Sequence, residues 1–230
     1  MIKRKKSAFT LSEVLITLAV VGTLAMLVLP GMIKDTNNRA MMSALQSTAS
    51  NIMAAVQTEI VRTSAKDLQD SNIYKDPVEF LKTLDPTKVE GNRGIIYYPT
   101  GGYKSINGTA QTGIATGSYN ASAILKNGVG IAILTNGRTA GGPEHAGEQV
   151  ALISIDLNGK HDPNIIGVDM FEIEIAKVSD LDTGVHIGDP IEYSSDKQTV
   201  INACKSGTPL ACYDLANLSG FNPNYLEDEE

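Results

Sequence analysis

The sequence predicts an α+β fold in which one long N-terminal helix packs on a small antiparallel β-sheet. An apolar run over residues 9–33 holds a single charge, and an amphipathic stretch at helical spacing follows it. Short apolar runs with β-branched residues and Asn-Gly pairs between them begin only after residue 120. The helix is therefore expected to precede the sheet along the chain.

The first 33 residues are typical of a membrane segment. About 20 apolar residues are enough to cross a bilayer as a helix, so residues 9–33 are predicted to form the transmembrane half of the long helix. Cations that flank a first span stay in the cytoplasm, and the rest of the chain is then expected on the other side of the membrane. Residues 1–8 form a basic leader with four cations, Lys3, Arg4, Lys5 and Lys6.

Glu13 is the one charge inside the apolar run. An ionised side chain at that depth costs about 2.5–3.5 kcal/mol, so it needs a partner. In a simple signal anchor, Glu13 would instead reach back to the interface. A cleaved secretory signal peptide fits less well, because its apolar region spans only about 7–15 residues and ends at an A-x-A-like site.

Residues 8–16, Ala-Phe-Thr-Leu-Ser-Glu-Val-Leu-Ile, carry a family resemblance. The segment resembles the class III prepilin signal of type IV pilins and of type II secretion pseudopilins. That signal has a basic leader, a small residue, and a Phe-Thr-Leu-x-Glu core that opens a long apolar helix. The resemblance implies cleavage between Ala8 and Phe9 by a membrane prepilin peptidase, and N-methylation of Phe9. The family usually has Gly before the cut, whereas this chain has Ala8, the next smallest side chain.

Cleavage would free an amine at Phe9, four residues before Glu13. In a bundle of staggered helices, Glu13 of one subunit can meet the terminal amine of a neighbour, which neutralises a charge that is costly alone in lipid. We therefore expect a structural subunit of a type IV pilus or a type II secretion pseudopilus. Its expected partners are prepilin peptidase, other pilin or pseudopilin subunits and an inner-membrane assembly platform.

Two other functions remain open from the sequence. The main alternative is a single-span, membrane-anchored extracytoplasmic binding module that does not polymerise. An anchored exported hydrolase is a weaker one, because the three histidines stand apart from any nucleophile motif. No enzyme activity is predicted. The net charge is −7, and it becomes −11 when the four leader cations are removed, which argues against a general grip on nucleic acid.

Residues 34–65 are predicted to form the amphipathic half of the same helix. If the helix is continuous from Phe9 to about Ser64, it is about 85 Å long. Pro30-Gly31 predicts a bend or a weak point in it. The apolar stripe that should face the globular domain consists of Met41, Leu45, Ala49, Ile52, Val56 and Ile60.

Residues 66–230 are predicted to form the exported globular domain. About four antiparallel strands are expected, over residues 122–126, 129–135, 149–157 and 171–178. In the last, apolar residues alternate with Glu172 and Glu174, which predicts one buried and one wet face. A short helix should start at Pro77 with Asp76 as its N-cap. Residues 91–118 are typical of a loop, and four tyrosines in and beside it are expected to pack: Tyr97, Tyr98, Tyr103 and Tyr119.

The loop that follows the third predicted strand has oxygen-bearing side chains at alternate positions and then a glycine. This pattern is faintly similar to a calcium loop. Major pseudopilins carry a calcium-binding loop late in their globular domain, but their motif is not matched residue by residue here. Asx-Gly and Pro-Asn are equally good turn formers, so a plain turn is the preferred reading. The candidate calcium ligands are Asp156, Asn158, Asp162 and Asp169; no other cofactor is expected.

Cys204 and Cys212 are the two cysteines of the chain. An exported domain meets an oxidising compartment, so a disulfide between them is expected. Free thiols or a metal site are the alternatives, and two cysteines alone do not favour a metal. The acidic end, residues 227–230, is expected to be either disordered or a solvated surface.

Overall fold

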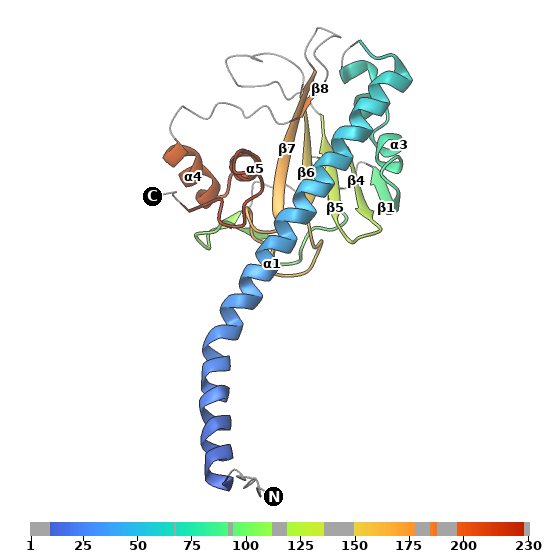
Figure 1. The fold of residues 1–230 in the computed structure, drawn as a ribbon. Coiled ribbons are helices and arrows are strands. Elements are labelled where there is room, and N and C mark those ends of the chain that lie inside the picture. The colour runs from blue at the N-terminus through green and yellow to red at the C-terminus, as the bar shows by residue number, and fades with distance from the viewer. Residues whose placement is uncertain are drawn as a thin grey trace, which may run out of the picture. The chain divides into compact units, whose positions relative to one another are not determined.

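The computed structural model describes residues 10–66, 68–91, 94–111, 119–135, 150–177, 185–187 and 197–227. The leader, Ala8 and Phe9 lie outside these ranges. The chain divides into two compact units, Met1–Ala40 and Met41–Glu230. Helix α1, Leu11–Thr63, contributes to both units and continues through Pro30 and Gly31 (Figure 1).

Helix α1 begins and ends at recognisable local signals. At its start, Thr10 and Glu13 form a reciprocal set of hydrogen bonds, described below. At its end, Ser64 has a φ of 50°, a left-handed conformation that stops the helix. The Ala65 amide donates to the carbonyl of Ile60 and satisfies one of the last free carbonyls. The predicted end near Ser64 agrees with this boundary.

In the second unit, α1 lies across the sheet (Figure 1). Its predicted apolar stripe is largely buried there. Leu45, Ile52 and Val56 are fully buried, and Ala49 fills the gap between them. The two ends of the stripe differ from the prediction. The buried residues there are Met42 and Glu59, whereas Met41 and Ile60 are only half-buried.

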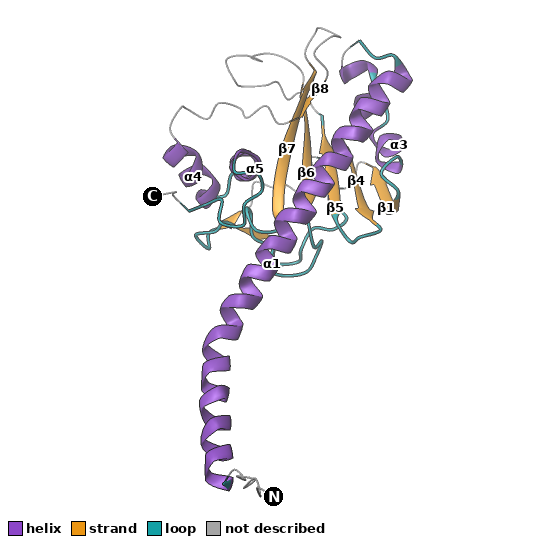
Figure 2. Cartoon of the chain, viewed as in Figure 1, coloured by secondary structure: helices purple, strands orange, loops and turns teal. Residues whose placement is uncertain are grey.

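The main sheet has six antiparallel strands in the order β1-β4-β5-β6-β7-β8 (Figure 2). Each strand pairs only with its neighbours in this order, and β4 to β8 follow the chain as a meander. The strands are β1 Pro86–Gly91, β4 Ala121–Leu125, β5 Gly130–Leu134, β6 Val150–Asp156, β7 Met170–Lys177 and β8 Val185–Ile187.

The prediction of about four strands was wrong in number. The four predicted strands are the central ones, β4 to β7, and the two edge strands β1 and β8 were missed. Strand β1, with the sequence PTKVEG, has the polar, proline- and glycine-containing composition of a turn. It is a strand because it pairs with β4, a long-range contact that its own sequence does not indicate. A short hairpin, β2 Tyr103–Lys104 with β3 Ala110–Gln111, also lies in the stretch predicted as loop.

In β7 the predicted alternation is confirmed, because Phe171, Ile173 and Ile175 are buried whereas Glu172 and Glu174 are half-buried. The centre of the sheet differs, since it is dry on both faces. Every residue of β5, and every described side chain of β6, is buried, including Ser154 and Asp156. Helix α1 covers one face, and tyrosines from the segment before β4 cover the other. The Tyr97 ring lies flat on β5, and it can do so only because Gly130 has no side chain: a Cβ there would lie 2.3 Å from the ring. The prediction that the tyrosines pack is confirmed for Tyr97, Tyr103 and Tyr119, which are buried.

Short helices complete the second unit. The predicted helix at Pro77 is confirmed: it is α3, Pro77–Lys82, and the Asp76 carboxylate accepts a hydrogen bond from the Glu79 amide as its N-cap. Near the C-terminus, α5 packs on β7 and against α4. The remaining helices are η1 Leu68–Asp70, α2 Asn72–Lys75, α4 Lys197–Ser206 and α5 Pro209–Leu218.

Candidate functional site

The first candidate site is the apolar part of α1. Residues Leu11–Val28 form a segment long and apolar enough to cross a membrane, and none of it is buried by the parts of the chain that the structure describes. Its largest side chains are open, with Leu11 78% and Leu27 79% exposed. So much contiguous apolar surface is not stable in water, so it needs lipid or other helices around it.

At the start of this segment, Thr10 and Glu13 satisfy each other. The Glu13 carboxylate accepts from the Thr10 amide at 2.8 Å and from the Thr10 hydroxyl at 2.9 Å. The Glu13 amide in turn donates to the Thr10 hydroxyl oxygen at 3.3 Å. This is a capping box, which satisfies two free donors at the start of a helix. The T-x-x-E spacing is the signal that could have predicted it, and the sequence reasoning missed it.

The capping box gives the Glu13 carboxylate hydrogen-bond donors within its own chain. The sequence predicted a partner for this carboxylate on a neighbouring subunit, and the structure shows that Thr10 of the same chain is already a hydrogen-bond partner. The cost of a charge in lipid therefore no longer excludes a plain anchor by itself. Cleavage at Ala8, methylation of Phe9 and pairing of Glu13 across subunits stay predictions, because Ala8 and Phe9 lie outside the described residues.

The second candidate site is the loop between β6 and β7, where the structure brings all four candidate calcium ligands together. Asp156 and Asp169 are fully buried. Asn158 bridges Asp169 and the Asp162 carbonyl through its side-chain amide, both at 3.1 Å. The sequence reasoning missed Asn164, which is 7% exposed and donates to the Asp162 carboxylate at 3.0 Å.

Both buried carboxylates of this loop accept hydrogen bonds on both of their oxygens. Asp169 accepts from the amides of Ile165 at 2.7 Å and Asn164 at 2.8 Å. Asp156 accepts from the backbone amide of Asn158 and from the Tyr103 hydroxyl. Burial raises the pKa of Asp156 to about 7; the Tyr103 hydrogen bond opposes this and the nearby Asp169 adds to it. Burial likewise raises the pKa of Asp169.

The donor set of the loop does not fit a calcium cage. Calcium needs six to eight oxygen atoms turned toward one point. Here the side-chain NH₂ group of Asn158 lies between the Asp162 carbonyl and the Asp169 carboxylate and donates to both. The Tyr103 hydroxyl proton points at the Asp156 carboxylate. Within the described part of the chain, no group of three or more His, Cys, Asp or Glu side chains could hold a metal ion.

The disulfide region lies next to this loop. Cys204 and Cys212 form a disulfide that joins α4 to α5, with their Cα atoms 4.7 Å apart. Gly167 lies directly against it, since a Cβ there would be 2.8 Å from the Cys212 sulfur. The Tyr225 hydroxyl donates to the Gly167 carbonyl. The C-terminal helices are thus fastened to the loop between β6 and β7 as well as to the sheet.

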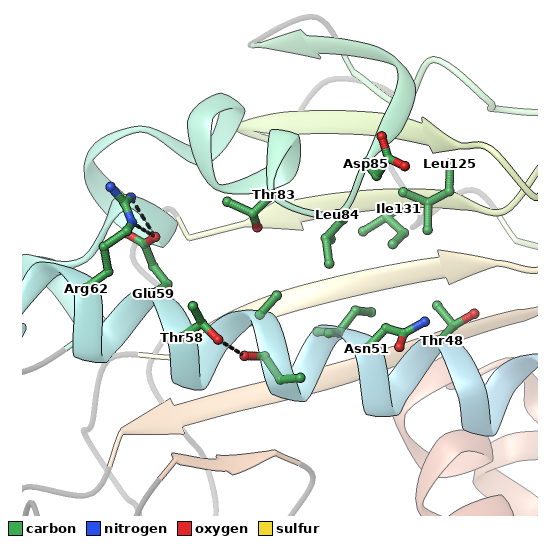
Figure 3. A pocket seen from close by; sticks show the side chains of 13 residues that line it. Thr48, Asn51, Thr58, Glu59, Arg62, Thr83, Leu84, Asp85, Leu125 and Ile131 are labelled. Atoms are coloured by element: carbon green, nitrogen blue, oxygen red, sulfur yellow. Dashed lines mark hydrogen bonds and ion pairs between the residues drawn. The ribbon is translucent and has the colours of Figure 1, made fainter.

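A groove of about 420 Å³ runs beside α1, between the helix and the turn after α3 (Figure 3). At one end the buried Glu59 carboxylate accepts from the Asn72 amide at 3.1 Å and from Arg62 at 2.7 Å. Glu59 thereby holds the end of α1 to α2. The groove is lined by Thr48, Asn51, Ile52, Ala54, Ala55, Thr58, Glu59, Arg62, Thr83, Leu84, Asp85, Leu125 and Ile131.

Comparison with known proteins gives one match. Residues 3–29 match the prokaryotic N-terminal methylation motif. Searches of curated proteins and of solved structures found no significant match. The match covers residues 3–8 of the leader, the capping box and the whole of the exposed apolar segment Leu11–Val28, which together carry the resemblance. The chain therefore begins with a prepilin-type methylation signal, the kind found in precursors of type IV pilins and pseudopilins.

Proposed function

We propose that this chain is a structural subunit of a type IV pilus or a type II secretion pseudopilus. The observation that carries the proposal is the methylation motif over residues 3–29, because it coincides with an apolar helix that no described part of the chain covers. A separate compact unit, Met41–Glu230, which includes the second half of α1, follows the apolar segment along the chain. This arrangement supports a subunit whose apolar segment stays in the membrane as an anchor and whose second unit is exported.

Processing comes first in this proposal. Prepilin peptidase cuts after Ala8 on the cytoplasmic face of the inner membrane, and the new amino terminus at Phe9 is methylated. The four leader cations are then lost from the mature chain. Those cations keep the leader on the cytoplasmic side while the globular unit crosses, which places that unit outside the cytoplasm. The disulfide is of the kind that persists in such a compartment.

Assembly follows from the exposed helix. An inner-membrane platform brings subunits together, and α1 leaves lipid to pack among the helices of other subunits. Close packing between helices stabilises such a bundle, since lipid tails are as apolar as the side chains themselves. We propose that Glu13 sets the register by pairing with the Phe9 amine of a neighbour. It would exchange its capping box with Thr10 for that ion pair, or keep both.

Mass spectrometry of the purified membrane-bound chain tests the proposal most directly. We expect a mature amino terminus at Phe9 with one added methyl group, and co-purification of further copies or related subunits. A co-expressed prepilin peptidase with an inactivated active site is the control, and it should leave Met1 in place. An intact Met1 in the presence of active peptidase, together with a monomeric chain, would refute the proposal.

The second candidate function is an anchored extracytoplasmic binding module. The groove beside α1 is the observation that favours it, because a partner could lie between the helix and the turn after α3. In that case the chain would keep its full anchor and remain monomeric. The same mass spectrum separates the two functions, since the module requires neither the cut nor the methyl group.

A further inference from the structure

We propose that the loop between β6 and β7, residues 157–169, is held by internal hydrogen bonds in which the Asn158 side-chain amide takes the place of a cation. These hydrogen bonds, from the side-chain amides of Asn158 and Asn164 to Asp162 and Asp169, are called the lock below. The lock joins three parts of the second unit: the main sheet, the β2 segment and the C-terminal helices. This inference does not depend on the function proposed above. It concerns the loop that the resemblance to pseudopilins associates with calcium.

The side-chain amide of Asn158 lies between two hydrogen-bond acceptors. Its NH₂ group donates to the Asp162 carbonyl and to the Asp169 carboxylate, both at 3.1 Å. Two acceptors that face each other need positive charge or a donor between them, because bare oxygens repel. A divalent cation could supply that charge, but here the two protons of one amide group do so.

Asn158 and Asn164 both turn their side-chain NH₂ groups, and not their oxygens, toward carboxylates. Asn164 also turns its NH₂ group toward an acidic oxygen, the Asp162 carboxylate at 3.0 Å. The oxygens of both amides are buried and accept no hydrogen bond from any residue that the structure describes. A cation site would need the opposite, with both oxygens turned toward the ion. Turned that way without an ion, they would stand against the acidic oxygens that their NH₂ groups now bind.

The loop that contains the lock also contacts the β2 segment and the C-terminal region. On one side, the Tyr103 hydroxyl donates to Asp156 at the end of β6. The backbone of Lys104 pairs with the loop, donating to the Asn164 carbonyl at 3.0 Å and accepting from the Ile166 amide at 2.9 Å. On the other side, Gly167 accepts from Tyr225 and lies against the disulfide. Loss of the lock should therefore loosen β2 and the C-terminal helices together.

Thermal unfolding of the full-length chain in detergent tests the inference. The wild-type Tm should be the same in millimolar calcium and in EDTA. Asn158→Asp removes the NH₂ group and adds a negative charge between two acceptors, so it should lower the Tm by several degrees in EDTA. Calcium should restore part of that loss, because the new carboxylate completes an oxygen-only set of ligands.

Asn127→Asp is the matched control. Asn127 lies in the exposed β4–β5 turn, and among the described residues its side chain uses only its oxygen, which accepts from the Val129 amide at 3.2 Å. An aspartate keeps that acceptor, so neither its Tm nor its response to calcium should differ from wild type. The control separates the loss of the NH₂ group from the effect of an added charge on the domain.

Tyr103→Phe keeps the experiment decisive if Asn158→Asp does not fold. It removes only the hydroxyl that reaches Asp156, so the Tm should fall, and calcium should not restore it. Two results would overturn the inference. One is a rise in the wild-type Tm on adding calcium, which would mean that the loop is a cation site. The other is an Asn158→Asp variant as stable as wild type in EDTA.

Discussion

The two halves of α1 have similar lengths and opposite surroundings. In the first half, over Leu11–Val28, no described residue of the chain covers the apolar side chains, so that Leu24, for example, is 57% exposed. In the second half the stripe around Leu45 is fully buried against the sheet. The same secondary structure is thus stabilised in two ways. The second half gains from its own domain, whereas the first half can gain only from lipid or from other chains.

The largest effect that we predict concerns the charge in the uncovered half. Glu13→Ala and Glu13→Gln should insert in the membrane but enter filaments at least about tenfold less than wild type. An amine without its carboxylate partner in lipid costs about 2.5 kcal/mol or more, and about 1.4 kcal/mol already corresponds to tenfold. The measurement is the amount of sheared filament relative to subunit in the membrane.

Glu13→Gln also tells the capping box apart from the ion pair. Glutamine can keep the capping box but has no charge. Thr10→Val keeps the charge and removes the hydroxyl, so we expect it to reduce assembly less than Glu13→Gln does. If Glu13→Gln forms filaments as well as wild type while Thr10→Val does not, helix capping rather than charge pairing explains this glutamate.

A pair of truncations compares the two halves directly. Leu45→Ala leaves a cavity between α1 and the sheet and should destabilise the full-length chain by about 2–5 kcal/mol. Leu24→Ala changes a side chain that the domain does not touch, and the loss should stay within about 0.5 kcal/mol. Chemical unfolding in detergent measures both. Equal losses would contradict the division into a self-stabilised half and an uncovered half.

The disulfide should have the next largest effect. Replacing Cys204 and Cys212 together by alanine opens a short loop, and the entropy of that loop predicts a loss of about 2–3 kcal/mol. The change should be seen as a lower Tm in oxidising buffer. In a strong reductant the wild type should approach the double variant. A double variant as stable as the oxidised wild type would show that α4 and α5 are held by packing alone.

The smallest effect depends on pH. Burial raises the pKa of Asp214 on α5 to about 7, and the nearby Glu174 of β7 adds to it. A raised pKa in the folded state means that the folded state binds the proton more tightly, so stability falls as the pH rises from the ordinary value of 3.8 through about 7.

Asp214→Asn should remove that penalty. The variant should match wild type below the ordinary carboxyl pKa and be more stable by roughly 1–3 kcal/mol above pH 7. Unfolding of both proteins across this pH range provides the measurement. The prediction fails if the difference between them does not change with pH.

Local and periodic signals gave the correct elements before the structure was known. The stripe at Leu45, Ile52 and Val56, the Asp76–Pro77 helix start and the Asn127-Gly128 hairpin all depend on residues close together in the chain. In the sheet, the errors arose where distant segments meet. Strand β1 exists because β4 lies beside it, and the second face of the sheet is dry because Tyr97 packs on Gly130.

The candidate loop shows the same limit at a site. The sequence indicated the oxygen-bearing residues Asp156, Asn158, Asp162 and Asp169, and the structure does bring them together. It gave no indication that Asn164 belongs with them or that Tyr103, 53 positions before Asp156, donates into the cluster. Whether such a set binds an ion depends on where its protons point, and spacing along a chain does not fix that.

By itself the sequence determined the prepilin-type signal, the membrane-length helix and the order of helix before sheet, because each is set by neighbouring residues or by a regular repeat. Tertiary structure alone decided which faces of the sheet are covered and how the loop between β6 and β7 satisfies its buried carboxylates. Those outcomes depend on burial and hydrogen bonds between segments far apart in the chain, which exist only once the chain has folded.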